Sequence, residues 1–320
     1  MKILLFILSI LLIISCDAPR ENPLDPNGDN YKFYSIQGYV KTQTGPPQPI
    51  ENAIVTWGAD AKITYTNAEG FFRIDNVNPV NDYLIVEKSG FLKDSNYINW
   101  VRRNISVEYF LNSIPELTEF NIYSEYENNY TLNPRTRIFF EAVVNDREGD
   151  LDSLYIANED LKIKKLLERK TFSLFDASFS QASLGINSLE ELIGKEFHLI
   201  ALDKSGKEYS IGNSNLKRVI RQEIEFISPA TLLDTVSTQP NLRWRRFQPG
   251  FKFEYTVRVF ENLTPPELRW ERSGISSDSI SVKVNVPLQP NTTQGYYWVV
   301  WCVDEFNNKG SSKPASFRVK

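Results

Sequence analysis

Carboxylates are the commonest groups in this sequence that could bind a metal or transfer a proton, and one short segment concentrates them. That segment follows an apolar run and carries acidic residues at two-residue spacing around Gly149: Asp146, Glu148, Asp150 and Asp152. Calcium takes about six to eight oxygen ligands, and alternating carboxylates in a glycine-bearing loop supply several of them. An EF-hand loop is excluded, because its twelfth position counted from Asp146 is Ala157 instead of glutamate. These four residues therefore predict either a calcium site or a solvated polar turn.

Other catalytic chemistry has few residues to work with. His198 is the only histidine among the 320 residues and lies in an apolar segment, which disfavours a Ser/His/Asp triad or a multi-histidine metal site. Paired carboxylates could hydrolyse glycosides without histidine, but nothing selects one pair among the 40 acidic residues. Cys302 has no catalytic motif around it. We therefore expect no enzyme and no cofactor apart from calcium, with a degenerate hydrolase as the catalytic alternative.

The six tryptophans raise the question of sugar binding, because an indole face stacks well on a pyranose ring. Three of them fall in alternating strand patterns and are expected in cores: Trp57, Trp244 and Trp298. Trp100, Trp270 and Trp301 are expected to be more exposed. Of these, Trp270 and Trp301 are the candidate glycan-binding residues.

The charge balance argues against nucleic acid as a partner. The chain has 36 Lys and Arg against 40 Asp and Glu, a net charge of −4, so no broad positive field is available to bind phosphates. Basic and aromatic residues alternate at 243–247, as they do in proteins that bind single strands, but Trp244 fits a core position better. The lysine-rich segment 162–170 is expected to be a solvated strand edge.

The first residues predict an export signal. Lys2 precedes an apolar run at 3–14, which ends at Ser15 and Cys16. This run is too short for a membrane-spanning helix, which needs about 20 apolar residues, and it fits the apolar region of a signal peptide. Residues 13–16, Ile-Ile-Ser-Cys, resemble the bacterial lipobox, whose cysteine receives diacylglycerol and becomes the new N-terminus. The alternative is an ordinary cleaved signal with an incidental cysteine.

The lipobox resemblance implies a location for the protein. A lipidated Cys16 would anchor it in a membrane of the cell envelope, facing the periplasm or the outside. Residues 1–15 are then the signal peptide, and residues 16–32 are a flexible tether rich in Pro, Asn and Asp. Asp17 resembles the inner-membrane retention signal of enteric bacteria. Other phyla sort by different rules, so the choice of membrane stays open.

The rest of the chain predicts an all-β protein with three β-sandwich modules in series, at 33–112, 113–224 and 225–320. Short alternating stretches rich in β-branched and aromatic residues are separated by Gly, Pro, Asn and Asp turns, which favours antiparallel sandwiches over βαβ units. Helix signals are sparse. The clearest is Ser188 with Glu191, a capping-box pattern that Gly194 ends.

Several segments of the first module carry a family pattern. They are Gly-Tyr-Val at 38–40, Ile-Glu-Asn-Ala-Ile-Val at 50–55, Thr-Asn-Ala-Glu-Gly-Phe-Phe at 66–72 and Tyr-Leu-Ile-Val-Glu-Lys-Ser-Gly-Phe at 83–91. In this order they resemble the carboxypeptidase regulatory-like domain, a seven-stranded transthyretin-like sandwich, which implies a non-catalytic spacer or stabiliser. The residues themselves place Val55 and Trp57 on one strand face and a tight turn at 67–70.

The third module carries a second family pattern. Its strand-like segments are Pro-Asn-Leu-Arg-Trp at 240–244, Tyr-Thr-Val-Arg-Val-Phe at 255–260 and Tyr-Tyr-Trp-Val-Val-Trp-Cys-Val-Asp at 296–304. They resemble a fibronectin type III or related immunoglobulin-like domain of bacterial secreted proteins. On this pattern Cys302 is a buried thiol with no disulfide partner. Trp301 departs from the family, on a face where a more polar residue is expected.

The middle module is predicted from strands at 138–144 and 197–202 and from a hairpin turn at 203–207. We interpret it as an immunoglobulin-like sandwich with an irregular insertion at 158–195, with a small helical lobe as the alternative for that insertion. Its acidic loop has a looser resemblance to the Asp-rich turns of bacterial cadherin-like domains.

Together these patterns predict a non-catalytic cell-envelope lipoprotein that serves as a binding, adhesion or scaffold module for another envelope or extracellular protein. The alternative is a surface lipoprotein that captures polysaccharide beside an outer-membrane nutrient transporter. The expected partners are therefore the membrane, through the lipid anchor, and a protein or a polysaccharide.

Overall fold

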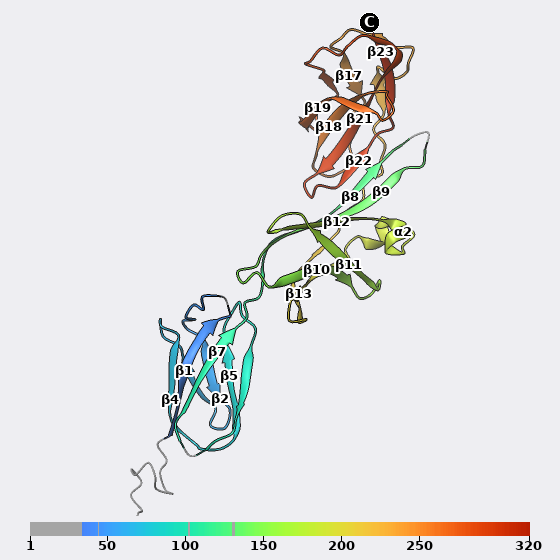
Figure 1. Ribbon diagram of the computed structural model, residues 1–320. Coiled ribbons are helices and arrows are strands. Elements are labelled where there is room, and N and C mark those ends of the chain that lie inside the picture. Colours follow the sequence, from blue (N-terminus) through green and yellow to red (C-terminus); the bar gives the residue numbers. More distant parts are fainter. Residues whose placement is uncertain (1–33, 44, 102, 130–131) are drawn as a thin grey trace, which may run out of the picture. The chain divides into compact units, whose positions relative to one another are not determined.

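The computed structural model describes residues 34–43, 45–101, 103–129 and 132–320. Strands make up nearly all of the regular structure (Figure 1), which confirms the predicted all-β class. Within the described residues there are two short helical segments, α2 (Gln181–Leu184) and the 3-10 helix η2 (Leu189–Leu192). Across these same residues, no helix combines the length and the apolar character that crossing a bilayer requires.

The chain forms two compact units, and the first holds the described residues up to Ile114 together with Arg147–Gly149. One of its sheets has the order β4-β1-β7, in which β1 pairs antiparallel with β4 and parallel with β7. The other sheet has the order β3-β2-β5-β6 and is antiparallel throughout. The strands are β1 (Tyr34–Thr42), β2 (Ile54–Trp57), β3 (Lys62–Tyr65), β4 (Phe71–Val77), β5 (Asp82–Glu87), β6 (Asp94–Ile98) and β7 (Ile105–Leu111).

Alternation along the strands explains how these two sheets pack. Val55 and Trp57 of β2 are fully buried, as are Leu84 and Val86 of β5, while the residues between them face away from the core. The buried side chains join Ile36 of β1 in one hydrophobic cluster, so the two sheets enclose a single core. The predicted common face of Val55 and Trp57 is confirmed.

The predicted turn at 67–70 is also confirmed. Asn67 Oδ1 accepts hydrogen bonds from the backbone N–H groups of Glu69 and Phe71, at 3.1 and 2.8 Å. Gly70 has a φ of 73°, a conformation in which a side chain would be strained. The turn joins β3 to β4, which lie in different sheets, so it carries the chain from one layer of the sandwich to the other.

The second unit comprises Pro115–Asp146 and Asp150–Lys320. In its first part, β14, β13 and β10 pair in one sheet and β12, β9 and β8 in another, while β11 pairs with β10 along most of its length and with β12 at its end. The strands are β8 (Glu116–Glu127), β9 (Arg135–Asn145), β10 (Leu151–Asn158), β11 (Ile163–Arg169), β12 (Leu174–Ser180), β13 (Glu196–Asp203) and β14 (Glu208–Asn215).

Residues 158–195 were predicted as an irregular insertion, and this prediction is wrong. They contain β11, β12, α2 and η2, because apolar side chains at intervals along them enter the core of this sandwich. The buried ones are Ile163, Leu167, Phe175, Leu184, Leu189 and Leu192. The alternative for this segment was a small helical lobe. Its helical structure consists of two four-residue segments, α2 and η2.

Two local sequence signals in this sandwich are confirmed. Ser188 and Glu191 form a capping box at η2. At the β13–β14 turn, Asp203 Oδ1 accepts hydrogen bonds from the backbone N–H groups of Ser205 and Lys207, at 2.8 and 3.0 Å. Burial opposes ionisation of this carboxyl, but these hydrogen bonds and that from the Ser205 hydroxyl outweigh it, and the pKa of Asp203 is lowered.

The second part of the unit is another sandwich. The sheet β15-β17-β20 packs over β19-β18-β21, with β22 and β23 paired to β21 and β16 paired to β23. Its strands are β15 (Phe226–Ser228), β16 (Thr235–Val236), β17 (Asn241–Trp244), β18 (Phe253–Glu261), β19 (Glu267–Ser276), β20 (Ser281–Lys283), β21 (Asn291–Asp304), β22 (Lys309–Ser311) and β23 (Ala315–Val319).

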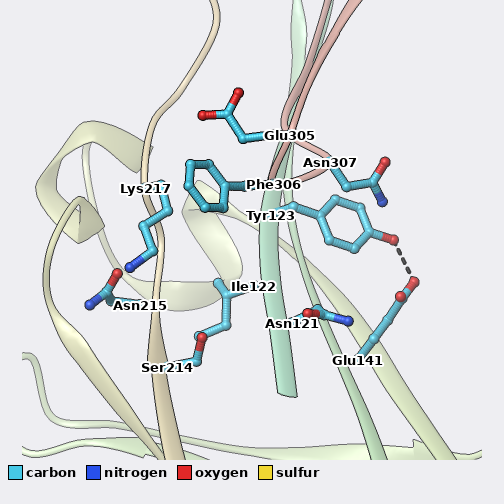
Figure 2. Close-up of a pocket in the computed structure, with 10 residues that line it drawn as sticks. All are labelled: Asn121, Ile122, Tyr123, Glu141, Ser214, Asn215, Lys217, Glu305, Phe306 and Asn307. Atoms are coloured by element: carbon cyan, nitrogen blue, oxygen red, sulfur yellow. Dashed lines mark hydrogen bonds between the residues drawn. The ribbon is translucent and has the colours of Figure 1, made fainter. Parts of the chain in front are cut away.

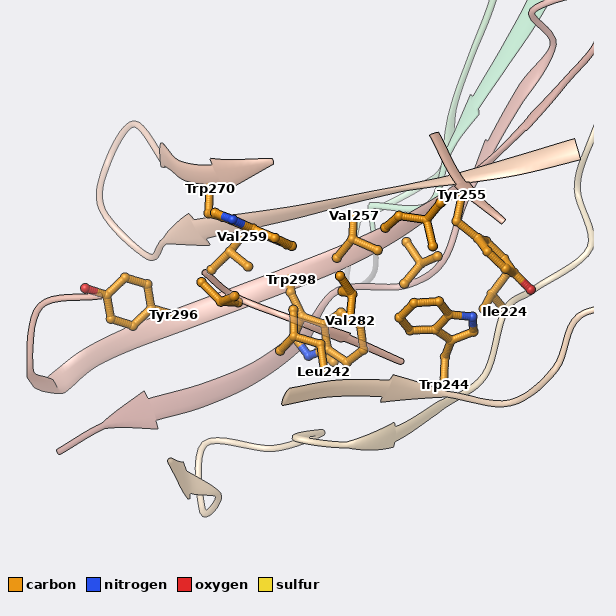
Figure 3. Close-up of a cluster of buried hydrophobic side chains, with 14 of the residues drawn as sticks. Ile224, Leu242, Trp244, Tyr255, Val257, Val259, Trp270, Val282, Tyr296 and Trp298 are labelled. Carbon is orange, nitrogen blue, oxygen red and sulfur yellow. The ribbon is translucent and has the colours of Figure 1, made fainter. Parts of the chain in front are cut away.

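The core of this sandwich is rich in aromatic rings (Figure 3). Trp244 of β17 and Trp298 of β21 reach it from opposite sheets, with ring centroids 6.4 Å apart, and Tyr255 of β18 packs edge-on against Trp244. Trp57, Trp244 and Trp298 are all fully buried, which confirms their prediction as core residues. Cys302 is a buried free thiol, as predicted.

The described residues form three separate hydrophobic clusters, one for each predicted module. The division between the two compact units falls after Ile114, and the second and third clusters lie within one unit. The domain limits themselves stay a prediction.

Candidate functional site

The two sandwiches of the second unit are joined through a shared sheet. β22 of one sandwich pairs in parallel with β8 of the other, with Lys309 opposite Glu125 and Gly310 opposite Tyr126. The connecting segment serves both cores, because Leu216 belongs to one hydrophobic cluster and Ile220 to the next. We call this junction the joint.

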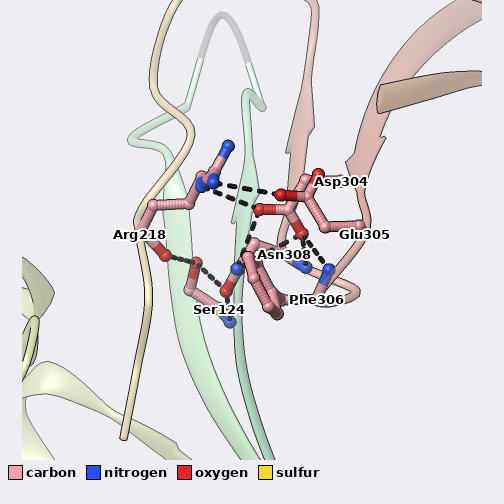
Figure 4. A network of polar contacts seen from close by, with 6 residues as sticks. All are labelled: Ser124, Arg218, Asp304, Glu305, Phe306 and Asn308. Atoms are coloured by element: carbon pink, nitrogen blue, oxygen red, sulfur yellow. Dashed lines mark hydrogen bonds and ion pairs between the residues drawn. The ribbon is translucent and has the colours of Figure 1, made fainter. Parts of the chain in front are cut away.

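A buried carboxylate organises the joint (Figure 4). The side chain of Asp304, at the end of β21, is fully buried. Its Oδ1 accepts hydrogen bonds from the backbone N–H groups of Phe306 and Asn308, at 2.9 and 2.8 Å, which closes the tight β21–β22 turn. Its Oδ2 lies 3.1 Å from Nε of Arg218, in the segment that connects the sandwiches. A buried charge needs such partners, since leaving it unpaired would cost several kcal/mol.

Asn308 carries the network across to the other sandwich. Its Nδ2 donates to Asp304 Oδ2 at 3.0 Å, and its Oδ1 accepts from the backbone N–H of Ser124 on β8 at 2.9 Å. The Ser124 hydroxyl in turn donates to the backbone carbonyl of Arg218 at 2.9 Å. Ser124 and Asn308 are fully buried. The amide of Asn308 uses both of its ends, so the two strands are held in one register.

Close contacts of Arg218 and Gly310 surround these hydrogen bonds. The guanidinium of Arg218 lies 4.2 Å from the ring centroid of Phe251 and 3.4 Å from the Glu305 carboxylate. A Cβ added to Gly310 would lie 2.3 Å from the backbone carbonyl oxygen of Ile220. The connecting segment therefore runs against β22 at a distance that only glycine permits.

A polar pocket of about 290 Å³ opens beside this network (Figure 2). It is lined by Asn121, Ile122, Tyr123, Glu141, Ser214, Asn215, Lys217, Glu305, Phe306 and Asn307. The hydroxyl of Tyr123 donates to the Glu141 carboxylate on the facing strand, and the Tyr123 ring stacks on Phe139 with centroids 5.0 Å apart. Burial, together with this hydrogen bond, raises the pKa of Tyr123, so its phenol stays protonated near neutral pH.

The chemistry available in this pocket is that of binding. Three amides, two hydroxyls, a lysine ammonium and two carboxylates can hydrogen-bond to a polar molecule, and the exposed ring of Phe306 offers an apolar surface. His198 and Cys302, the two side chains most apt to act as base or nucleophile, do not line it. His198 lies 3.4 Å from Glu196 on the same strand. Burial raises the pKa of the Cys302 thiol to about 12, which makes it a poor nucleophile.

The two tryptophans predicted to bind glycans are not exposed. Trp270 is 7% exposed and Trp301 is 6% exposed, so the expectation of exposure is wrong for both. The indole of Trp270 lies within the core (Figure 3), and its Nε1 donates to Asn285 Oδ1 at 2.7 Å. Arg258 lies over the Trp301 ring at 5.6 Å. Strand alternation assigns each residue to a face but does not tell what covers that face, and neighbouring side chains cover both rings.

The four carboxylates predicted as a calcium site do not gather around one point. Among the described residues there is no group of three or more His, Cys, Asp or Glu side chains that could hold a metal ion. Asp146 Oδ2 accepts a hydrogen bond from the backbone N–H of Leu151 at 2.8 Å, and Glu148 Oε2 accepts one from that of Ser113 at 2.8 Å. Backbone groups thus take up part of the carboxylates of Asp146 and Glu148, and the Ser153 hydroxyl donates to Asp152 Oδ2 at 3.2 Å. Calcium binding itself stays untested.

Cys16, the predicted lipidation site, lies outside the described residues. The residues of the joint were not found by sequence reasoning, because Asp304 and Asn308 stand in what looks like an ordinary polar hairpin turn. The signal that could have found them is an aspartate at the end of a strongly apolar strand, where a buried carboxylate must be satisfied by the turn that follows.

Comparison with known proteins finds weak structural similarities. Neither a family model nor a curated protein matches this chain. The fibronectin(III)-like modules of Clostridium thermocellum CbhA are 11% identical, with 64% of this chain and 93% of that chain covered and a TM-score of 0.31. The FN1-FN3 domains of chicken CNTN1 are 9% identical, with 85% and 92% covered and a TM-score of 0.34.

A third similar structure is BcpA, the major pilin subunit of Bacillus cereus. It is 9% identical, with 90% of this chain and 98% of that chain covered and a TM-score of 0.28. These scores and identities support no argument on function.

Proposed function

We propose that this protein is a lipid-anchored, non-catalytic module of the cell envelope, which binds, adheres to or holds in place another envelope or extracellular protein. The observation that carries the proposal is the joint. A shared sheet and a buried hydrogen-bonded network around Asp304 hold two sandwiches in one arrangement. Such a rigid body suits presentation of a binding surface, because little conformational entropy is lost when a partner binds.

The side chains that could have argued for catalysis support the same proposal. The Cys302 thiol is buried and resists ionisation, and the described residues include no metal-binding cluster. The pocket beside the joint supplies hydrogen-bonding groups instead of a nucleophile paired with a base.

The anchor is tested in a bacterial host by metabolic labelling with an alkyne fatty acid. Wild type should be labelled and recovered with membranes, and the Cys16→Ala chain should be neither. Labelling of the Cys16→Ala chain, or an unlabelled wild type, would contradict lipidation at this position.

The binding role is tested by chemical cross-linking in intact envelopes followed by mass spectrometry. We expect one specific cross-linked protein with wild type and a clear loss of it with Asn308→Asp, which breaks the joint. The control is Asn241→Asp, which changes an exposed asparagine of the same sandwich that does not line the pocket. An identical cross-linking pattern for all three chains would argue against a role for the rigid joint in binding.

A second candidate function is the capture of polysaccharide. The observation that favours it lies in the first compact unit, where large apolar side chains are exposed together on one sheet face.

A further inference from the structure

The outward face of the sheet β3-β2-β5-β6 carries large side chains that do not contribute to the core. Ile63 is 60% exposed, Tyr65 61%, Tyr83 50% and Tyr97 51%. Single exposed apolar residues are ordinary on a protein surface, but a contiguous group of them usually marks a binding surface. We call these four residues the aromatic face.

Strand register brings the members of the aromatic face together. On β3 and β2, Tyr65 lies opposite Ile54, and Ile63 lies opposite Thr56. Tyr83 of β5 lies opposite Tyr97 of β6, with ring centroids 5.0 Å apart. Ile85 of β5 lies opposite Thr56 and so connects the side chains on β3 and β2 with the tyrosine pair on β5 and β6. The four strands, of which β2 and β5 are labelled in Figure 1, thus present one apolar surface, with a tyrosine on each of its outer strands, β3 and β6.

A pocket lies at one end of this surface. Its volume is about 410 Å³, and Ile54, Tyr65 and Phe91 supply its apolar side chains. Its charged groups are Glu87, Lys88 and Lys93. Ile54, Tyr65 and Glu87 stand in one register row across three strands, so the pocket is continuous with the aromatic face.

The charges around the pocket compensate one another. Lys93 Nζ lies 2.7 Å from the Glu87 carboxylate, and Lys88 Nζ donates to the backbone carbonyl of Asn52 at 3.4 Å. An anionic ligand would find the lysines already engaged and a carboxylate beside them. The electrostatics therefore favour an uncharged ligand.

On its own, the face is too small to hold a stable dimer of this chain. Strands lie about 4.8 Å apart and rise about 3.3 Å per residue, so the face measures roughly 14 Å between its outer strands and roughly 13 Å along them. With side chains this is at most about 400 Å², whereas a stable interface buries about 800 Å² on each partner. A narrow, chain-like ligand fits this area better than a second folded surface.

The chemistry of the face distinguishes between chain-like ligands. A peptide lying across the face would bury backbone N–H and C=O groups against apolar rings, with only tyrosine hydroxyls to pair them. A sugar chain has no amide backbone, and each of its rings offers an apolar face and a rim of hydroxyls. Tyrosine matches both, with a flat ring and a hydroxyl at its end.

We propose that the aromatic face and its adjoining pocket bind a stretch of a neutral polysaccharide, with Tyr65 and Tyr97 as the main stacking residues. This proposal identifies the binding site for the second candidate function, the capture of polysaccharide. It rests on that function only for the location of the protein in the cell envelope.

The test is affinity electrophoresis of the full-length chain through native gels containing soluble starch, laminarin, xylan, galactomannan or dextran. At least one of these should retard wild type, and the double variant Tyr65→Ala/Tyr97→Ala should bind that polysaccharide at least tenfold more weakly. Tyr65→Phe/Tyr97→Phe should keep most of the affinity, since stacking remains. The matched control is Tyr39→Ala, a 41% exposed tyrosine on the other sheet of the same unit.

Three results would overturn the proposal. One is the absence of retardation by all five polysaccharides, and another is equal retardation of wild type and the Tyr65→Ala/Tyr97→Ala chain while near-ultraviolet circular dichroism shows both to be folded. The third is concentration-dependent dimerisation that this double variant abolishes, which would make the face a contact between copies. These outcomes are independent of fatty-acid labelling at Cys16, so failure of this site and failure of the envelope anchor can be told apart.

Discussion

At the scale of single residues, the joint depends on groups whose two ends are both used. Asp304 accepts from two backbone N–H groups of its own turn and pairs with Arg218 from another segment. Asn308 donates to that carboxylate with its nitrogen and accepts from Ser124 with its oxygen. No other common side chain of that size offers one donor and one acceptor end in this geometry.

The substitution Asn308→Asp tests whether the joint depends on the amide of Asn308. It removes the Nδ2 donor and places a second carboxylate against Asp304 in a fully buried position. We expect the free energy of unfolding to fall by about 3 kcal/mol in urea titrations near neutral pH. Asn307→Asp is the control, because Asn307 is exposed and aspartate tolerates its φ of 65°. The control should change stability by less than about 0.5 kcal/mol. An equal loss of unfolding free energy in both variants would mean that the joint does not depend on the amide of Asn308.

Cys302 supports a prediction about alkaline pH. Burial, with a smaller contribution from Asp304, raises the pKa of its thiol from 9.0 to about 12. Between these two values the unfolded chain releases the thiol proton while the folded chain retains it, so stability falls as the pH rises, by about 1.4 kcal/mol per pH unit. Urea titrations at pH 8 and 10.5 should therefore show a loss for wild type about 2 kcal/mol larger than for Cys302→Ala. A loss of the same size in both chains would contradict the raised pKa.

At the scale of elements, the β21–β22 hairpin does two tasks. β21 supplies core residues of its own sandwich, such as Trp298 and Val300, and β22 extends the sheet to β8 of the neighbouring sandwich. This pairing requires the connecting segment to run closely against Gly310. The local sequence predicts the hairpin, but the partner strand β8 stands more than 180 residues earlier in the chain.

Gly310→Ala tests the close approach. The new Cβ would lie 2.3 Å from the Ile220 carbonyl oxygen, so the connecting segment or β22 has to shift. We expect a loss of about 2 kcal/mol in the free energy of unfolding and faster hydrogen exchange at the backbone amides that pair β8 with β22. Gly45→Ala is the matched control, because nothing lies within 4 Å of its added Cβ. If the amides of both variants exchange at the wild-type rate, the joint accommodates a methyl group at position 310, and the predicted steric conflict is wrong.

At the scale of the whole molecule, the described residues form three hydrophobic clusters in two compact units. The second and third clusters lie in sandwiches that share a sheet and the Asp304 network. The first cluster lies in a unit of its own. Cooperativity of unfolding should follow this division.

Differential scanning calorimetry of the full-length chain should show two transitions, one for each compact unit. Asn308→Asp should lower the midpoint of one transition by roughly 6 to 12 °C, the shift expected for about 3 kcal/mol in a unit of this size, and leave the other unchanged. The control variant Asn307→Asp should superimpose on wild type. Three separate transitions in wild type would show that the joint does not couple its two sandwiches.

The amino-acid sequence by itself determined the all-β class, the inward faces of strands such as β2 and β5, and local features that need only a few neighbouring residues, among them the turn at 67–70 and the capping box at Ser188. Alternation and turn chemistry act over short stretches of chain, so they can be read directly. Only the tertiary structure decided that Trp270 and Trp301 are covered, that Asp304 and Asn308 join two sandwiches, and that Tyr65 and Tyr97 share one face. What covers or accompanies a side chain comes from strands far away in the sequence, and no local pattern records which strands those are.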